Sequence, residues 1–190
     1  MSRLRAVLAT GNAGKAAELS RLLGRDVESR AIEVDENAAT YAGNALLKAH
    51  AAAAVADGRI GLGDDSGIEV TALGGEPGLH SARWTGPTDA DRNEALLARI
   101  ERAPDRSAVF VCVLAAVLPD GREIVVEGRV EGVLADEPRG DGGHGYDPLF
   151  MAEGDTRTVA ELTPVEKDAI SHRGRAARAL AAALAEAGIT

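Results

Sequence analysis

The N-terminal part of the chain has a short apolar run followed by apolar residues at helical spacing. Leu4 to Ala9 is a short apolar run that ends at the turn-forming residues Thr10-Gly11-Asn12. Beyond this turn the apolar positions recur at the spacing of one helix face: Ala16, Leu19, Leu22 and Leu23. The N-terminal pattern therefore predicts a strand, a loop and a helix, in that order.

Three later segments also have the pattern of a helix. An alanine-rich stretch from about Tyr41 to Val55 precedes Gly58, which can end a helix. Thr88 can cap a helix over Asp89 to Ala103. A last helix is expected over Ala176 to Ala187.

Strand patterns lie between these helices. Ile60 to Gly63 is predicted as a brief strand that places Asp64-Asp65-Ser66-Gly67 at its carboxyl end. Ser107 to Leu118 and Glu123 to Leu134 flank the turn sequence Pro119-Asp120-Gly121-Arg122, and the second run alternates between two faces. We therefore expect an antiparallel hairpin over these two runs.

Composition limits the class of protein. The chain has 190 residues, of which 45% are hydrophobic and 27% charged, as in a globular protein that buries its own core. We expect a single domain over residues 1–190. Its one cysteine, Cys112, cannot form a disulfide within the chain, and no apolar run approaches the roughly 20 residues of a membrane span. These features favour a cytoplasmic protein without a membrane partner.

Charge limits the possible partners. The net charge of −9 argues against general affinity for nucleic acid, because the phosphate backbone requires a basic surface. A phosphorylated substrate would need a local cationic pocket. Of the 21 basic residues only Lys15, Lys48 and Lys167 are lysine, and a compact ammonium group suits a phosphate. Lysines left at these positions by chance are the alternative.

Two segments could hold a phosphate group and a metal ion. Residues 10–15 join the first strand to the first helix, where free backbone N–H groups and the helix dipole favour an anion, although their spacing is not that of GxxxxGK[ST]. Asp64 and Asp65 are adjacent carboxylates, and an oxygen-bound Mg²⁺ is one reason to keep both ionised. An ordinary glycine turn, a solvated acidic turn and a phosphoacceptor aspartate are the alternatives.

Two later segments add candidate binding groups. Pro138 to Pro148 carries four glycines and is expected to be a loop whose backbone can approach a ligand closely. Thr163-Pro164-Val165-Glu166 has the capping-box pattern of a helix start, and Lys167 follows it. Ser171 to Arg175 could bind a phosphate or a base edge, or could compensate the dipole at a helix C-terminus.

Together, five motifs resemble the inosine triphosphate pyrophosphatase family, which includes the dITP/XTP pyrophosphatases. They follow the order and spacing of that family over nearly the whole chain: ATGNAGKAAEL, DDSGIEV, LGGEPGLHSARWTG, GDGGHGYDPLF and AELTPVEKDAISHRGRA. The resemblance implies an α/β fold with a long mixed β-sheet flanked by helices, two lobes with an active-site cleft between them, and a homodimer. It also implies Mg²⁺-dependent hydrolysis of deaminated purine nucleoside triphosphates (dITP, ITP, XTP and dXTP) to the monophosphate and pyrophosphate, which removes them from the nucleotide pool.

The resemblance also assigns roles to single residues. Asp65 matches the catalytic acidic residue and a metal ligand, while Asp64 and Glu36 match acidic residues near the metal. Positions that match substrate contacts are Thr10, Gly11, Asn12, Ala13, Gly14, Lys15, Ser66, His144, Gly145, Tyr146, Asp147, Lys167, His172 and Arg173. Water activated by Asp65 would attack the α-phosphorus, and donors from Arg173 and the His172 backbone would recognise the 6-oxo group of the purine.

Two positions depart from the family pattern, and two other functions remain open. Relatives commonly have an acidic residue where this chain has Gly43 and an aromatic ring where it has His144, so a helix contact and base stacking are in question. The first alternative function is a septum-inhibitor-like pyrophosphatase that acts on modified pyrimidine or methylated nucleotides, whose activity would show on dTTP or UTP instead of dITP. The second is a nucleotide-binding module without activity, which would bind ITP tightly and release no pyrophosphate.

Overall fold

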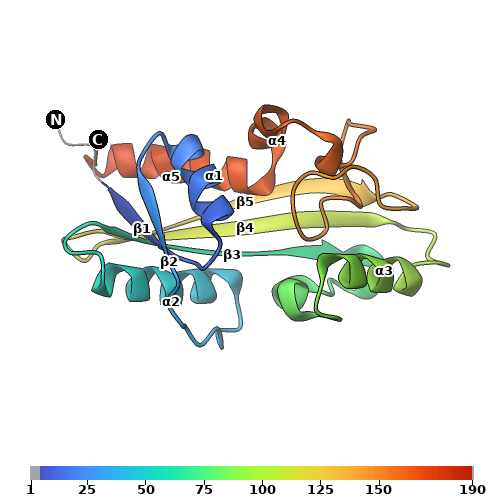
Figure 1. Cartoon of the computed structure of the whole chain (residues 1–190), viewed down its shortest axis with the longest axis horizontal. Coiled ribbons are helices and arrows are strands. Elements are labelled where there is room, and N and C mark those ends of the chain that lie inside the picture. The colour runs from blue at the N-terminus through green and yellow to red at the C-terminus, as the bar shows by residue number, and fades with distance from the viewer. Residues whose placement is uncertain (1–4, 190) are drawn as a thin grey trace. The chain divides into compact units, whose positions relative to one another are not determined.

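The computed structural model describes residues 5–189, and within them six strands form one mixed sheet (Figure 1). The strands are β1 (Ala6–Ala9), β2 (Val27–Arg30), β3 (Ile60–Val70), β4 (Ser107–Val117), β5 (Glu123–Leu134) and β6 (Phe150–Ala152). Their order in the sheet is β2-β1-β3-β4-β5-β6; β1 is parallel to β2 and β3, and β5 is antiparallel to β6. The predicted α/β class with a long mixed sheet is confirmed.

Helices flank the sheet, and their starts are set by short polar motifs. The α-helices are α1 (Ala13–Leu23), α2 (Tyr41–Ala54), α3 (Asp89–Arg99), α4 (Pro164–Ile170) and α5 (His172–Glu186). Thr88 and Thr163 form complete capping boxes at the starts of α3 and α4, as the sequence predicts. No helix within residues 5–189 combines the length and apolar character needed to cross a membrane.

The chain divides into two compact units. The first contains the residues up to Asp65, residues 112–128 and the residues from Arg173 onward, and the second contains residues 66–111 and 129–172. Strands β3, β4 and β5 each contribute residues to both units. That the whole chain acts as one domain remains a prediction.

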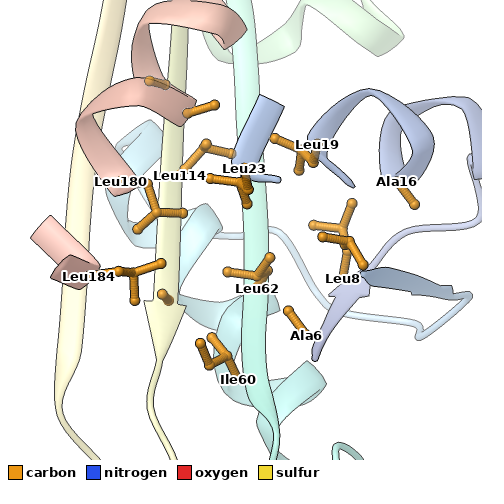
Figure 2. Packing of buried hydrophobic residues seen from close by; sticks show 14 of the residues in the cluster. Ala6, Leu8, Ala16, Leu19, Leu23, Ile60, Leu62, Leu114, Leu180 and Leu184 are labelled. Atoms are coloured by element: carbon orange, nitrogen blue, oxygen red, sulfur yellow. The ribbon is translucent and has the colours of Figure 1, made fainter. Parts of the chain in front are cut away.

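In the first unit, helices cover both faces of the sheet. Alternate residues of β4 separate onto these faces: Cys112, Leu114 and Ala116 pack with α1 and α5, and Val113, Ala115 and Val117 pack with α2. Figure 2 shows the first of these clusters, and its labelled members include Leu19, Leu23, Leu62, Leu114, Leu180 and Leu184. Burial on both faces explains why β4 is an unbroken apolar run in the sequence.

Helix α2 lies unusually close to β3. A Cβ added at Gly63 would stand 2.1 Å from the Ala45 carbonyl oxygen, and one at Gly61 would stand 2.3 Å from the Ala53 backbone nitrogen. Glycine in the strand and fully buried alanines in the helix, such as Ala49, therefore let the two backbones touch. This contact fixes the polar residues of α2 against β3.

The second unit has a separate core. Helix α3 contributes Leu96 and its C-cap residue is Ile100, both fully buried. The sheet contributes Phe110 and Phe150, whose ring centroids are 4.6 Å apart. The aromatic ring of Tyr146 also lies in this cluster. The unit thus packs α3 and the loop of residues 138–148 around one set of buried side chains.

The β4–β5 hairpin and most element bounds agree with the sequence, but three predictions were wrong. Strand β3 continues to Val70, so Asp64-Asp65-Ser66-Gly67 lies within the strand and not after it. It is a central strand, and backbone pairing outweighs the turn preference of these residues. Helix α3 ends at Arg99 instead of Ala103, and α5 begins at His172 instead of Ala176.

A single residue with an extended backbone, Ser171, separates α4 from α5. Ser171 ends α4 with φ −66° and ψ 156°, and the next helix begins directly after it. Strands β2 and β6 were not predicted, because they are too short to establish a period. Leu4, the first residue of the predicted N-terminal strand, lies outside the described residues.

Candidate functional site

The loop between β1 and α1 has the form of an anion site. The Thr10 backbone nitrogen donates to Arg30 O at 2.8 Å, which ties the end of β1 to β2. Asn12 caps the helix, since its Oδ1 accepts from Lys15 N at 3.2 Å. Residues 11–14 are exposed, so the helix N-terminus is open to a ligand.

A pocket of about 660 Å³ opens beside this loop within the first unit. It is lined by Ala9, Thr10, Gly11, Lys15, Ile32, Glu33, Val34, Asp35, Glu36, Lys48 and Asp64. Six of the residues singled out from the sequence therefore surround one cavity: Thr10, Gly11, Lys15, Glu36, Lys48 and Asp64. The pocket carries two of the three lysines.

Asp64 is a buried, ionised carboxylate. Its side chain is 2% exposed, and its Oδ2 accepts from Lys15 Nζ at 2.9 Å and lies 3.7 Å from Arg173 Nη2. Burial alone would raise the pKa of Asp64, but the positive charges of Lys15, Arg173 and Lys48 outweigh it and hold that pKa below its usual value. Asp64 thus serves as the counter-ion of Lys15 and Arg173.

Asp65 contacts two residues of α2, which covers the other face of the sheet. Its Oδ2 accepts from Asn44 Nδ2 at 3.0 Å, and its Oδ1 lies 3.8 Å from Lys48 Nζ. The same ammonium lies 3.4 Å from Glu36 Oε2. Asn44 is itself fixed, because its Oδ1 accepts from Ala38 N at 3.0 Å. Lys48 thus lies near two carboxylates that the sequence analysis associated with a metal ion.

The two aspartates face opposite ways because they lie in a strand. Successive strand residues point to opposite faces, and Asp64 pairs with Lys15 of α1 while Asp65 pairs with Asn44 and Lys48 of α2. The prediction that both carboxylates stand at the end of a strand is therefore wrong, since β3 continues to Val70. Glu36 and Asp65 are the pair that shares one cationic neighbour.

Arg173 is the most deeply buried charged side chain of the first unit. It is 0% exposed, and its Nη1 donates to Glu18 Oε2 at 3.1 Å. The resemblance placed Arg173 at the purine and gave Glu18 no role. Sequence reasoning missed Glu18 and Asn44; the only signal was a polar residue within a helix that otherwise buries apolar positions.

The second unit brings together the glycine-rich loop and α4. Asp147 is 1% exposed, and its Oδ2 accepts from Lys167 Nζ at 2.7 Å and from His144 N at 2.9 Å. The Tyr146 hydroxyl donates to Ser81 O at 3.0 Å inside the core, and burial raises the pKa of Tyr146 to about 12. The phenol of Tyr146 therefore belongs to the core of the second unit.

Two further predicted positions lie near the start of α5 and in β3. The His172 ring is 5% exposed and stacks on Phe110 with the ring centroids 4.5 Å apart. Its side chain therefore packs against the core of the second unit. Ser66 follows Asp65 within β3.

The departure at Gly43 has a steric reason. A Cβ at this position would stand 2.5 Å from the Ala38 Cβ, and Gly43 N donates to Thr40 Oγ1 at 3.0 Å as part of the α2 cap. A larger residue at position 43 would displace the segment that holds Asn44. His144, the second departure, is exposed and is held through its backbone.

The donor set fits a metal ion that is shared with a substrate. Within residues 5–189 no group of three or more histidine, cysteine, aspartate or glutamate side chains forms a complete metal cage. Glu36 and Asp65 supply oxygen only, and Mg²⁺ is commonly bound by one or two carboxylates together with substrate phosphates. The first unit thus combines an exposed helix N-terminus, two lysines and acidic side chains, which is the arrangement of an α/β protein that binds phosphorylated ligands.

Comparison with known proteins places the chain in a family. The model of the Ham1 family matches residues 6–183, and this chain belongs to the Ham1 family. The chain is 51% identical to a dITP/XTP pyrophosphatase of Symbiobacterium thermophilum (93% of this chain, 92% of the relative) and 50% identical to one of Frankia alni (96% and 98%). The family resemblance of the five motifs is thereby confirmed.

Solved structures agree. A HAM1 protein from Coxiella burnetii superposes with a TM-score of 0.86 at 39% identity, covering 96% of this chain and 99% of that one. A nucleoside-triphosphatase / dITP/XTP pyrophosphatase from Mycobacterium abscessus has a TM-score of 0.72 at 44% identity, covering 93% and 97%. Fold and sequence thus match over almost the full length of both chains.

Proposed function

We propose that this chain hydrolyses dITP, ITP, XTP and dXTP to the nucleoside monophosphate and pyrophosphate. The observation that carries the proposal is the pocket of the first unit, where the loop of residues 10–15, Lys48 and acidic side chains surround a cavity that could hold a triphosphate. The dITP/XTP pyrophosphatases at about 50% identity support it.

Glu36 and Asp65 would hold the divalent cation, which we take to be Mg²⁺. When bound, the cation supplies positive charge to phosphate oxygens and lowers the barrier to attack on phosphorus. The pairing of both carboxylates with Lys48 supports this assignment, since the pair already accommodates positive charge. Asp64 is assigned to Lys15 and Arg173 instead, because its ionised oxygen is engaged there.

Different residues of the chain bind the phosphates, accept the proton and orient the proton acceptor. Backbone N–H groups at the start of α1 and the Lys15 ammonium bind phosphate oxygens. A carboxylate oxygen of Asp65 accepts the proton of the water that attacks the α-phosphorus, and pyrophosphate leaves. Asn44 holds Asp65 Oδ2 and so orients that carboxylate. Lys167 offsets further negative charge on the substrate.

Selectivity rests on donors near the start of α5. The His172 backbone N–H and Arg173 would donate to the 6-oxo group of the purine. Adenine has an amino donor at that position, so buried donors would go unpaired, and such a mismatch rejects a substrate by orders of magnitude. Guanine must be excluded separately, through its 2-amino group.

The comparisons do not favour the alternative functions. The curated relatives cited are named dITP/XTP pyrophosphatases, and none is named as a pyrimidine pyrophosphatase or as a binding module. Lys15, Asp64 and Asp65 are all present, which argues against an idle module. The proposal further includes a homodimer, from the family resemblance, and a cytoplasmic location, from the composition of the chain.

Product analysis tests the proposal. With dITP and Mg²⁺ we expect dIMP and pyrophosphate in equal amounts, no activity after chelation with EDTA, and recovery when Mg²⁺ is restored. Release of dIDP and inorganic phosphate would contradict the assignment of the α-phosphorus as the point of attack.

A further inference from the structure

Helix α3 holds both polar atoms of the Gly145 peptide group. Asp89 Oδ2 accepts from Gly145 N at 2.7 Å, and Asn93 Nδ2 donates to Gly145 O at 3.0 Å. Asp89 and Asn93 are four residues apart, so they lie on the same helix face. All three residues belong to the second unit, and neither helix residue was singled out by the sequence.

The helix residues are themselves fixed. Arg92 Nη2 pairs with Asp89 Oδ1, while Asp89 lies in the first turn of α3, where a negative charge suits the helix dipole. Partial burial would raise the pKa of Asp89, but the bonds from Gly145 N and Arg92 outweigh it and lower that pKa. Farther along, the fully buried Leu96 anchors the helix in the core.

The buried polar side chain of Asn93 needs an explanation. It is 4% exposed and lies on the face of α3 that also buries Leu96, where an apolar side chain would pack without loss. Burying an amide is unfavourable unless its groups are hydrogen-bonded. The bond from Nδ2 to Gly145 O offsets part of that penalty, while Oδ1 has no hydrogen-bond partner among the described residues. The one hydrogen bond of this buried amide therefore goes to the Gly145 peptide group.

Holding the Gly145 peptide group in place constrains the positions of the residues on either side of it. Gly145 has φ +64°, a conformation that other residues adopt with strain, and it lies between His144 and Tyr146. His144 N and Lys167 Nζ both donate to Asp147 Oδ2. The path of the chain through Gly145 therefore sets the position of His144 and of the Asp147–Lys167 pair.

We propose that Asp89 and Asn93 are positioning residues for nucleotide binding, acting through the Gly145 peptide group. The proposal rests on the proposed function, because it takes the segment from His144 to Asp147 as a substrate-binding segment. Loosening the peptide would weaken nucleotide binding. It would leave the binding of phosphates by the loop of residues 10–15 unchanged.

Two variants that preserve side-chain size should differ in their effect on the KM for dITP. Asp89→Asn keeps an oxygen acceptor for Gly145 N, so KM for dITP should stay within about threefold of wild type. Asn93→Asp places a carboxylate oxygen against Gly145 O in place of a donor, so KM should rise about tenfold or more with kcat changed less. Glu94→Ala, an exposed residue on the same helix, is the control and should change neither value.

Inhibition by inorganic tripolyphosphate separates positioning from general damage. We expect its inhibition constant to change much less than the KM for dITP in all variants, since most of its proposed contacts are with the loop of residues 10–15. Equal effects of Asp89→Asn and Asn93→Asp, or a parallel loss of tripolyphosphate binding, would overturn the proposal.

Hydrogen exchange provides a readout that does not need turnover. The Gly145 amide should exchange at least about tenfold faster in Asp89→Ala than in Glu94→Ala, because the acceptor at 2.7 Å is removed. This measurement also serves if Asn93→Asp does not fold. Unchanged exchange refutes the positioning proposal even in an active enzyme, whereas a wild-type protein that does not hydrolyse dITP refutes the proposed function alone.

Discussion

Asp64 and Asp65 show how two adjacent, identical side chains can have separate roles. Because they lie in a strand, one faces Lys15 and the other faces Asn44 and Lys48. The first is held ionised by cations, and the second is oriented beside Glu36 through Lys48. Each role can be tested by changing one residue.

Asp65→Asn should abolish turnover and preserve nucleotide binding. Asparagine has the same size but cannot accept the proton of the attacking water, so kcat should fall by roughly 10²–10⁴. Steady-state kinetics with dITP and calorimetric binding of ITP measure the two effects. Loss of ITP binding would instead show that Asp65 is structural.

Lys48→Met should strengthen the binding of a divalent cation in the absence of nucleotide. The ammonium lies 3.4 Å from Glu36 Oε2 and 3.8 Å from Asp65 Oδ1, so its removal leaves two carboxylates without that positive charge. Mn²⁺ binding followed by electron paramagnetic resonance should tighten about threefold or more. Lys48→Arg keeps the charge and should bind Mn²⁺ as wild type does; equal affinity in all three proteins would refute this role.

At this scale the sequence identified residues but not their partners. Lys15 and Asp65 could be found from motifs, whereas Asn44 and Glu18 could not, because their roles depend on contacts with residues distant in the sequence. Arg173 was expected at the purine, and its burial against Glu18 was not foreseen.

Among the elements, α2 and β3 depend most on close backbone contact. Their packing positions Asn44 and Lys48 beside Asp65 through glycines that permit no side chain. The alanine-rich composition of α2 is thus a packing requirement and not a neutral bias.

Gly63→Ala tests that contact. The added Cβ would stand 2.1 Å from Ala45 O, so the free energy of unfolding should fall by about 2 kcal/mol or more in urea denaturation. Gly11→Ala is the matched control, because its Cβ would stand 3.8 Å from the Ala31 Cβ, an ordinary contact. Similar stability of the two variants would contradict the packing described.

The cap of α4, the helix that carries Lys167, should titrate at low pH. Glu166 accepts hydrogen bonds from Thr163 and pairs with Arg157, and these contacts lower the pKa of Glu166 to about 2. Because this pKa is depressed, the stabilisation is complete above the ordinary carboxyl pKa and is lost as the pH falls through about 2. A Glu166 carboxyl carbon shift with a midpoint near 4.5 in NMR titration would contradict the capping box.

Elements whose bounds depend on neighbouring residues were predicted well. The errors occurred where the bounds depend on contacts between residues distant in the sequence. The caps at Thr88 and Thr163 and the hairpin turn depend on neighbouring residues, so they could be predicted from the sequence. The length of β3 depends on pairing with other strands. The start of α5 depends on the packing of His172 against Phe110.

Across the molecule, each lysine pairs with a carboxylate of its own unit. In the first unit Lys15 pairs with Asp64, and Lys48 with Glu36 and Asp65; in the second unit Lys167 pairs with Asp147. In a chain with a net charge of −9, these lysines give each unit a local positive charge. This distribution fits a substrate that brings several negative charges to a few defined positions.

The most direct test of the account is the rate of pyrophosphate release with Mg²⁺ from dITP, XTP, dATP, dGTP and dTTP under one set of conditions. The account predicts that kcat/KM for dITP and XTP exceeds that for the other three by about a hundredfold or more, because only the deaminated purines satisfy the donors at the purine 6-position without an excluded 2-amino group. Preferential turnover of dTTP, or tight binding of ITP without any pyrophosphate release, would contradict it.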